Sequence, residues 1–386
     1  MKRKIALFLS SMMLISSLAG CGASAESGEG SGTQTTSPTE NVQESGEKEG
    51  TGDTDQKSEM GEEANAGLSG KTLRVGTMPV TLGVPVQYAY DQGYFEDAGL
   101  DVEIVLFATG APVNEAMAAG EIDVAVSGMA SVYALATGMY TYIGDGSITL
   151  DGEAIYARPD SDIAKAEGVL PGTKGSADTV KGKSILGPLA TTAHFMAIKY
   201  VESLGLTAND FTMMSMEYAQ AYQAFVMGDG DLLATKPPYT SQLEDEGYVR
   251  VCSIADAMGS AMVNANYAQS SLMTERREDL KVFLDCYYRA CEELNNDKEM
   301  RKEYSMKWYA DNGIEFSDAD MEDEMETKIY PTFETLDSEE YPFGLTMVSI
   351  GEFFTEQGMI EKDDLPNIEA SMDDSLVKEL KEEHGV

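Results

Sequence analysis

Short polar segments follow several of the predicted β-strands, and their residue types suit the binding of a small molecule. Hydroxyl groups and the free main-chain amides at helix starts donate hydrogen bonds, glycine permits close approach of the backbone, and lysine pairs with acids. In α/β sheets, ligands bind beyond the carboxyl ends of the strands, where these segments are expected. The candidate ligand-binding residues are Met78, Pro79, Thr81, Thr109, Gly110, Ser127, Gly128, Met129, Thr191, Thr192, His194, Glu217 and Lys236.

Thr191 and Thr192 stand at the start of a helix predicted over residues 194–204. The first N–H groups of a helix have no internal partner and carry partial positive charge, so adjacent hydroxyls complete a site for an anion or acceptor. A threonine here can equally serve only as the N-cap of the helix. His194, inside the helix, is either a ligand contact or a structural residue. The sequence leaves both pairs of alternatives open.

Lys236 follows a strand predicted over residues 232–235 and has two alternative roles. Its ammonium group can neutralise an acidic ligand, or it can pair with Glu217 and contribute nothing to binding. Apart from Arg158, no arginine falls near the candidate segments. A bidentate arginine clamp for a carboxylate or sulfonate is therefore not predicted.

Metal binding and covalent catalysis have few suitable residues in this chain. It contains two histidines, His194 and His384, and no Cys-x-x-Cys spacing. Cys286 and Cys291 lie roughly 140° apart around a predicted helix, so they cannot form a disulfide with each other. We expect no catalytic residue, no metal, no cofactor and no structural disulfide.

Strand-like and helix-like patterns alternate along residues 71–143 and again along residues 183–251. This alternation predicts mostly parallel sheets with helices on both faces. A helix, a glycine, two residues, an aspartate and a strand occur in residues 116–126 and recur in residues 224–234. The repeat favours two similar α/β lobes. After about residue 257 the pattern is mainly helical.

The first 21 residues have the pattern of a bacterial lipoprotein signal peptide. Three basic residues precede an apolar run that ends near residue 18, shorter than the ~20 residues needed to span a bilayer. The sequence Leu-Ala-Gly-Cys ending at Cys21 resembles a lipobox, which implies lipidation of Cys21; an ordinary signal peptide is the alternative. Residues 22–69 lack aromatic residues and predict a disordered acidic linker.

The composition excludes several classes of protein. Of the 386 residues, 42% are apolar and 24% are charged, which is typical of soluble globular chains and not of polytopic membrane, collagen-like or wholly disordered proteins. The formal net charge of −40 disfavours nucleic acid as a partner, because affinity for phosphates depends on Lys and Arg.

Five segments together resemble the ABC-importer solute-binding proteins of the sulfonate/nitrate/taurine and thiamine-precursor (pyrimidine) group. They are residues 73–80 (LRVGTMPV), 91–105 (DQGYFEDAGLDVEIV), 115–128 (EAMAAGEIDVAVSG), 180–195 (VKGKSILGPLATTAHF) and 352–377 (EFFTEQGMIEKDDLPNIEASMDDSLV). In that group a turn matching residues 190–194 contacts the ligand. Members usually carry an aromatic residue where Lys236 stands, and this departure puts an aromatic lid in doubt.

The resemblance implies an α/β fold of the type II periplasmic-binding-protein class, with two lobes joined by a two-strand hinge. The crossings are expected near residues 154–158 and 256–266. Lobe I would then comprise residues 71–155 and 260–386, and lobe II residues 156–259.

The resemblance also implies a function. The protein would be a monomeric lipoprotein, anchored through Cys21 on the outer face of the bacterial cytoplasmic membrane, that captures a small molecule and delivers it to ABC permease subunits. A sulfonate-, nitrate- or taurine-like anion and a thiamine-precursor-like heterocycle both remain open as ligands. The alternatives are an enzyme on the same fold, of the pyrimidine-forming or sulfinate-cleaving type, and a sensor or adhesion lipoprotein.

Overall fold

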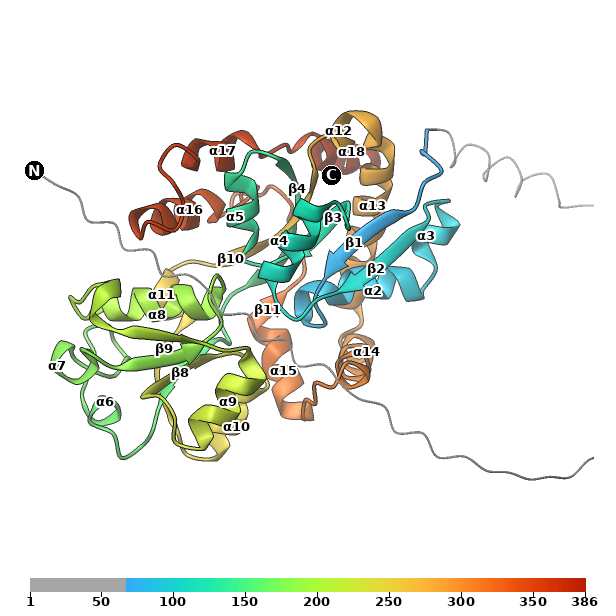
Figure 1. Cartoon of the computed structure of the whole chain (residues 1–386). Coiled ribbons are helices and arrows are strands. Elements are labelled where there is room, and N and C mark those ends of the chain that lie inside the picture. Colours follow the sequence, from blue (N-terminus) through green and yellow to red (C-terminus); the bar gives the residue numbers. More distant parts are fainter. Residues whose placement is uncertain (1–66) are drawn as a thin grey trace, which may run out of the picture. The chain divides into compact units, whose positions relative to one another are not determined.

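Residues 67–386 are described by the computed structural model, and they form two separate β-sheets with their helices (Figure 1). The predicted signal peptide, the predicted lipidation site Cys21 and residues 22–66 of the predicted linker lie outside the described residues. The linker prediction extended to residue 69, but Ser69 is already part of the fold. Its N–H donates to a carboxylate oxygen of the buried Asp279 at 2.8 Å. The folded region therefore begins before residue 71, where the sequence pattern placed its start.

The first sheet has six strands in the order β11-β4-β10-β3-β1-β2. β1 lies between β2 and β3 and runs parallel to both, whereas β10 runs antiparallel to β3 and β4. The strands are β1 (Leu73–Thr77), β2 (Val102–Leu106), β3 (Val124–Ser127), β4 (Tyr140–Thr149), β10 (Met262–Gln269) and β11 (Lys328–Ile329).

The second sheet has five strands in the order β7-β6-β8-β5-β9. β6 runs parallel to β7 and β8, and β5 runs antiparallel to β8 and β9. The strands are β5 (Ala154–Ala157), β6 (Ser184–Gly187), β7 (Thr212–Ser215), β8 (Leu232–Thr235) and β9 (Val249–Ser253).

Both sheets are mixed, so the prediction of mostly parallel sheets was wrong for the strands that enter each sheet from the other. Strand–helix–strand alternation implies parallel neighbours where a helix returns the chain to the same end of a sheet. β5 follows β4 of the first sheet without an intervening helix, and β10 arrives from the second sheet. These two strands consequently pair antiparallel with their neighbours.

The helix predicted over residues 194–204 is α8 (Thr192–Ser203), which begins two residues earlier than expected. Val84–Asp91 and the long Arg277–Asn296 pack against each other beside the first sheet, and Thr192–Ser203 packs on strands of the second sheet. No helix within residues 67–386 has both the length and the apolar character needed to cross a membrane. The helices are η1 (Thr81–Gly83), α2 (Val84–Asp91), α3 (Tyr94–Asp97), α4 (Gly110–Ala119), α5 (Ser131–Ala136), α6 (Asp162–Lys165), α7 (Ala177–Val180), α8 (Thr192–Ser203), η2 (Ala208–Asp210), α9 (Tyr218–Val226), α10 (Tyr239–Asp245), α11 (Ile254–Met258), α12 (Leu272–Glu275), α13 (Arg277–Asn296), α14 (Lys298–Asp311), α15 (Asp318–Thr327), α16 (Met347–Glu356), α17 (Leu365–Ala370) and α18 (Ser375–His384).

The internal repeat has the same structural role in both sheets. Asp123 accepts a hydrogen bond from the N–H of Arg74 at 2.9 Å, and Asp231 accepts one from the N–H of Ser184 at 2.9 Å. The N–H of each aspartate donates back to the carbonyl of the same partner, at 2.8 and 3.0 Å. Each aspartate thus ties the start of one strand to the neighbouring strand, which explains its position directly before β3 and β8.

The chain passes between the sheets at residues 150–153 and again at residues 259–261. The resemblance placed these crossings near residues 154–158 and 256–266. However, Ala154–Ala157 already pair with β8 and β9, and Met262–Gln269 pair with β3 and β4. The crossing segments are therefore shorter than expected, and each lies just before a strand.

Helix α8 of the second sheet is also held by α16. Phe195 lies 4.7 Å from Phe353 between ring centroids, and Gln357 donates a hydrogen bond to Glu202 at 2.8 Å. Phe195 and Phe353 are both buried. In this structure these contacts join α16 to α8, whose first turn carries two of the candidate residues.

Asp145 is a buried carboxylic acid in the middle of β4. Its Oδ1 accepts hydrogen bonds from the hydroxyl of Tyr142 at 2.6 Å and from the N–H of Gly344 at 2.9 Å. Burial raises the pKa of Asp145 to about 6, although the two hydrogen bonds act in the opposite direction and Asp337 adds to the rise. A carboxyl group whose pKa is higher in the folded than in the unfolded chain destabilises the fold when it is ionised.

We expect Asp145→Asn to stabilise the protein above pH 6. Oδ1 of asparagine can accept both existing hydrogen bonds, and the buried charge is removed. A shift of roughly two pKa units corresponds to about 3 kcal/mol, which is the upper limit of the gain at pH 7.5. The gain should shrink as the pH falls from 6 to 4, where Asp145 is protonated in the native state.

Urea unfolding of both proteins at pH 4.5 and 7.5 measures this difference. Asp363→Asn, at an exposed position, is the matched control and should change stability by less than about 0.5 kcal/mol. A loss of stability in Asp145→Asn at pH 7.5 would contradict the assignment.

Candidate ligand-binding site

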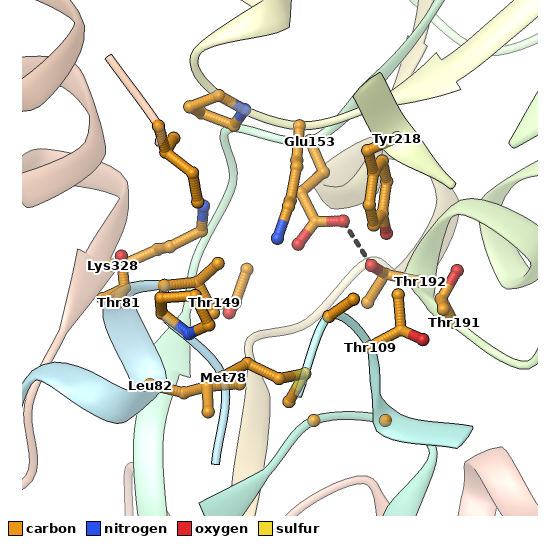
Figure 2. A pocket seen from close by; sticks show the side chains of 18 of the residues that line it. Met78, Thr81, Leu82, Thr109, Thr149, Glu153, Thr191, Thr192, Tyr218 and Lys328 are labelled. Atoms are coloured by element: carbon orange, nitrogen blue, oxygen red, sulfur yellow. Dashed lines mark hydrogen bonds between the residues drawn. The ribbon is translucent and has the colours of Figure 1, made fainter. Parts of the chain in front are cut away.

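A cavity of about 400 Å³ opens where strands of both sheets end (Figure 2). Residues that follow β1, β3, β6, β7 and β8 line it, together with the end of β4 and segments near α14 and α15. Its size lies in the range of about 300–1,000 Å³ found for small-molecule sites. The cavity therefore occupies the place that the α/β architecture favours for a ligand.

Most of the candidate residues come together around this cavity. The lining includes Met78, Pro79, Thr81, Thr109, Gly110, Gly128, Met129, Thr191, Thr192, Glu217 and Lys236. Ser127 and His194 are not part of the lining. Both residues are buried, and both are close in sequence to lining residues, Ser127 to Gly128 and His194 to Thr192.

Gly110 and Ser127 explain how tightly two helix starts approach each other at the cavity. A Cβ atom on Gly110 would lie 2.5 Å from the Cβ of Ala130 and 3.2 Å from the hydroxyl oxygen of Ser127. Gly110 begins α4, and Ala130 directly precedes α5. A glycine is required because any side chain here would push these two helices apart.

The hydroxyl groups of Thr191 and Thr192 are already engaged by the protein. Thr191 donates to the carbonyl of Pro188 at 2.9 Å, and Thr192 donates to the carboxylate of Glu153, as the dashed line in Figure 2 marks. Neither forms a side-chain cap on α8. Thr191 does occupy the N-cap position of α8, as one of the alternatives predicted, but its hydroxyl does not cap the helix, so the first N–H groups of α8 receive no side-chain partner from either threonine.

His194 supports the turn that precedes α8. Its Nδ1 accepts a hydrogen bond from the N–H of Ala190 at 3.3 Å, and Ala190 has a left-handed backbone with φ of 56°. Burial lowers the pKa of His194 to about 4, so the ring is neutral at pH 7 and can accept this bond. Of the two alternatives for His194, the structural one fits these contacts.

Lys236 is half-buried and projects over the ring of Tyr218, with Nζ 4.8 Å from the ring centroid. No carboxylate oxygen of residues 67–386 lies within 4.0 Å of this ammonium group. The alternative in which Lys236 pairs with Glu217 was therefore wrong. Burial lowers the pKa of Lys236, and the attraction of Glu153 is the strongest effect opposing it.

A buried ion pair that the sequence analysis missed also borders the cavity. Lys328 Nζ lies 3.2 Å from a carboxylate oxygen of Glu324, and both side chains are over 90% buried. Glu324 also accepts hydrogen bonds from Thr81 and, at 3.3 Å, from Tyr309. Figure 2 shows Lys328 and Thr81 at the cavity with Glu153.

The sequence carried little signal for these missed residues. Glu324 and Lys328 are four apart, a spacing that usually marks an exposed pair on a helix. β11 has only two residues, too few to show a strand pattern. Glu153 directly precedes a predicted hinge strand, and that position was the available hint.

The cavity is not lined by any thiol. Cys252, Cys286 and Cys291 are free, buried and outside the lining. Burial raises the pKa of Cys252 and of Cys286 to about 12, so these thiols are protonated at neutral pH. Within residues 67–386 no three His, Cys, Asp or Glu side chains are grouped as metal ligands.

Comparison with known proteins places this fold in a family. The sequence model of the NMT1-like family matches residues 67–308, which is more than half of the chain. The chain belongs to the NMT1-like family. The match begins at the first described residue, includes every strand of both sheets except β11, and ends within α14. It thus includes every candidate ligand-binding residue.

This NMT1-like chain is also similar to named transport proteins. It is 28% identical over 321 residues to a protein of Brachyspira hyodysenteriae provisionally named an ABC transporter periplasmic binding protein, with 81% of this chain and 92% of the relative covered. The alkanesulfonate-binding protein SsuA from Xanthomonas axonopodis pv. citri, bound to MOPS, superposes with a TM-score of 0.61 at 17% identity, covering 79% and 98% of the two chains. The nitrate-binding protein NrtA from Synechocystis PCC 6803 gives 0.63 at 14% identity, covering 81% and 88%. The fold is that of the periplasmic binding proteins, as the resemblance implied.

Proposed function

We propose that this protein is the extracytoplasmic solute-binding component of an ABC importer. It captures a small molecule in the cavity and presents it to the permease subunits. The observation that carries the proposal is the cavity itself, which collects helix starts and strand ends from both sheets around one space. The name of the Brachyspira relative supports the same role.

The proposed mechanism is closure of two lobes around the ligand. Lobe I would comprise residues from about 69 to 153 and from about 260 to 386, and lobe II the residues between 153 and 260. A ligand that touches residues of both sheets favours the closed arrangement by its difference in affinity for the two states. The short crossing segments support a hinge, because few residues need to change conformation.

Attachment through a lipid on Cys21 is part of the proposal. The lipobox-like sequence at Cys21 would place acyl chains at the new N-terminus, and each buried CH₂ contributes roughly 0.8 kcal/mol to membrane binding. The residues between Cys21 and Ser69 would join the anchor to the folded part. The protein would then act as a monomer on the outer face of the cytoplasmic membrane.

Binding without chemical conversion is favoured over catalysis. The two enzymatic alternatives need a cleft cysteine or a histidine acting with lysine, whereas here the described cysteines and His194 lie outside the cavity lining. Lys236 therefore has neither a cysteine nor a histidine beside it in the lining with which to act.

The test separates the three classes of function. The purified full-length protein is incubated with the small molecules extracted from the growth medium of its source, and the retained compound is identified by mass spectrometry. We expect it to be recovered unchanged, and its cellular uptake to be lost when the neighbouring permease is deleted. Conversion of the compound would indicate an enzyme, and permease-independent uptake would indicate a sensor or adhesion role.

A further inference from the structure

Glu153 and Lys236 face each other at one end of the second sheet. β5 and β8 are antiparallel, with Ala154 opposite Thr235, so the next residues in this register are Glu153 and Lys236. Both line the cavity. The sheet therefore brings a carboxylate and an ammonium group side by side into the ligand space.

The two groups nevertheless do not form an ion pair. No carboxylate oxygen lies within 4.0 Å of Lys236 Nζ within residues 67–386, and Lys236 rests on the ring of Tyr218 instead. The carboxylate of Glu153 is held by the hydroxyl of Thr192, at the start of α8. The carboxylate of Glu153 and the ammonium group of Lys236 can therefore each still bind a ligand in the cavity.

Glu153 occupies the position that an anionic ligand would prefer. The N-terminus of the twelve-residue helix α8 carries partial positive charge and N–H groups without side-chain caps. In this chain the protein supplies its own carboxylate there, because Thr192 at the first turn binds Glu153. A simple anion placed at this helix end would lie against a like charge.

The other charged residues of the lining also disfavour a simple anion as the ligand. Besides Lys236, the only other lysine of the lining is Lys328, which is already paired with Glu324. Glu217 adds a third, exposed carboxylate at the cavity. Three carboxylates and two ammonium groups leave an excess of negative charge, which disfavours a ligand that carries negative charge alone.

We infer that the ligand is a small zwitterion, with a cationic hydrogen-bond donor beside an acidic group. The cationic group binds the carboxylate of Glu153, and the acidic group binds the ammonium of Lys236 above Tyr218. Together they supply the counter-charges that Glu153 and Lys236 do not supply to each other. This inference rests on the proposed solute-binding function and narrows its ligand class.

The test uses a panel of matched compounds with the full-length protein. Amino acids and aminosulfonates, whose ammonium and acid groups are separated by chains of increasing length, are compared with the same acids lacking the amine and the same amines lacking the acid. Calorimetry should show at least one zwitterion binding at least about tenfold more tightly than both of its matched compounds, which is about 1.4 kcal/mol.

Variants of Glu153 and Lys236 then test whether these two residues cause the preference for a zwitterion. Glu153→Gln should retain the bond from Thr192 and remove the preference over the matched acid, whereas Lys236→Met should remove the preference over the matched amine. Glu369→Gln, at an exposed position on α17, makes the same charge change outside the cavity and should leave the preference unchanged.

Two results of the compound panel would overturn the inference. One is equal or tighter binding of the matched acids, and the other is a panel in which no zwitterion binds. In the first case tight binding of an acid in the cavity still supports a solute receptor, so the inference fails without the proposed function. Unchanged preference in both Glu153→Gln and Lys236→Met would equally remove the pair from recognition.

Discussion

Lys328→Met is expected to lower the free energy of unfolding by about 3–5 kcal/mol, the cost of leaving one member of a buried ion pair without its partner. Burial lowers the pKa of Lys328, but the attraction of Glu324 and Glu153 outweighs it, so the net shift is upward. The carbonyl of Lys328 also accepts a hydrogen bond from the buried Arg301 at 2.8 Å, which anchors β11 in this environment. Without the ammonium group, the carboxylate of Glu324 remains buried and uncompensated.

Chemical denaturation at pH 7 measures the loss, and two further variants define its cause. In Lys328→Met/Glu324→Gln the charge is removed from both partners, so most of the stability should return. Lys378→Met breaks a pair of the same spacing with Asp374 that is largely exposed, and should cost far less stability than Lys328→Met. If Lys328→Met costs no more than Lys378→Met, the ion pair at the cavity contributes nothing to stability.

Gly83→Ala is expected to disturb both stability and ligand binding. A Cβ at this position would lie 2.2 Å from the carbonyl oxygen of Met78 and 2.9 Å from Thr77 and Trp308. The carbonyl belongs to the backbone of the loop that lines the cavity, so it cannot move aside as a flexible side chain could. Overpacking of this kind costs about 1–3 kcal/mol, and displacement of the loop should weaken binding about tenfold.

Gly351→Ala separates the two effects. Its Cβ would lie 2.3 Å from a methyl group of Ile368, outside the cavity lining. Because that methyl is the end of a flexible side chain and can move aside, the loss of stability should be smaller than in Gly83→Ala, and a ligand identified for the unmodified chain should bind as before. Thermal unfolding measures the stability of both variants, and calorimetry measures their affinity for the ligand. Full affinity in Gly83→Ala would mean that the loop at Met78 does not contact the ligand.

Local patterns predicted the elements that carry the site. The strand predicted over residues 232–235 is β8 (Leu232–Thr235), with the same bounds, and the segment 211–216, which also has a strand-like pattern, contains β7 (Thr212–Ser215). The positions of Thr191 and Lys236 at the cavity followed from the rule that strand ends gather at one edge. These inferences needed only neighbouring residues, because strand alternation and helix caps are local properties.

The pairing of strands could not be predicted in the same way. The antiparallel places of β5 and β10 depend on which sheet a strand joins after the crossing, and no local pattern encodes that choice. Ser69 resembled the end of a polar linker, yet Asp279, 210 residues away, binds it. Such contacts are visible only when distant segments have been brought together.

The chain's own sequence determined its α/β class and the polar strand ends at which a ligand is expected. Tertiary structure alone decided the charges that surround that ligand. The register of β5 and β8 sets Glu153 beside Lys236, and the return of β11 to the first sheet brings Lys328 to the cavity. The reason is physical: hydrogen-bond patterns and hydrophobic periodicity act between near neighbours, whereas charge pairing depends on distances that folding establishes between remote residues.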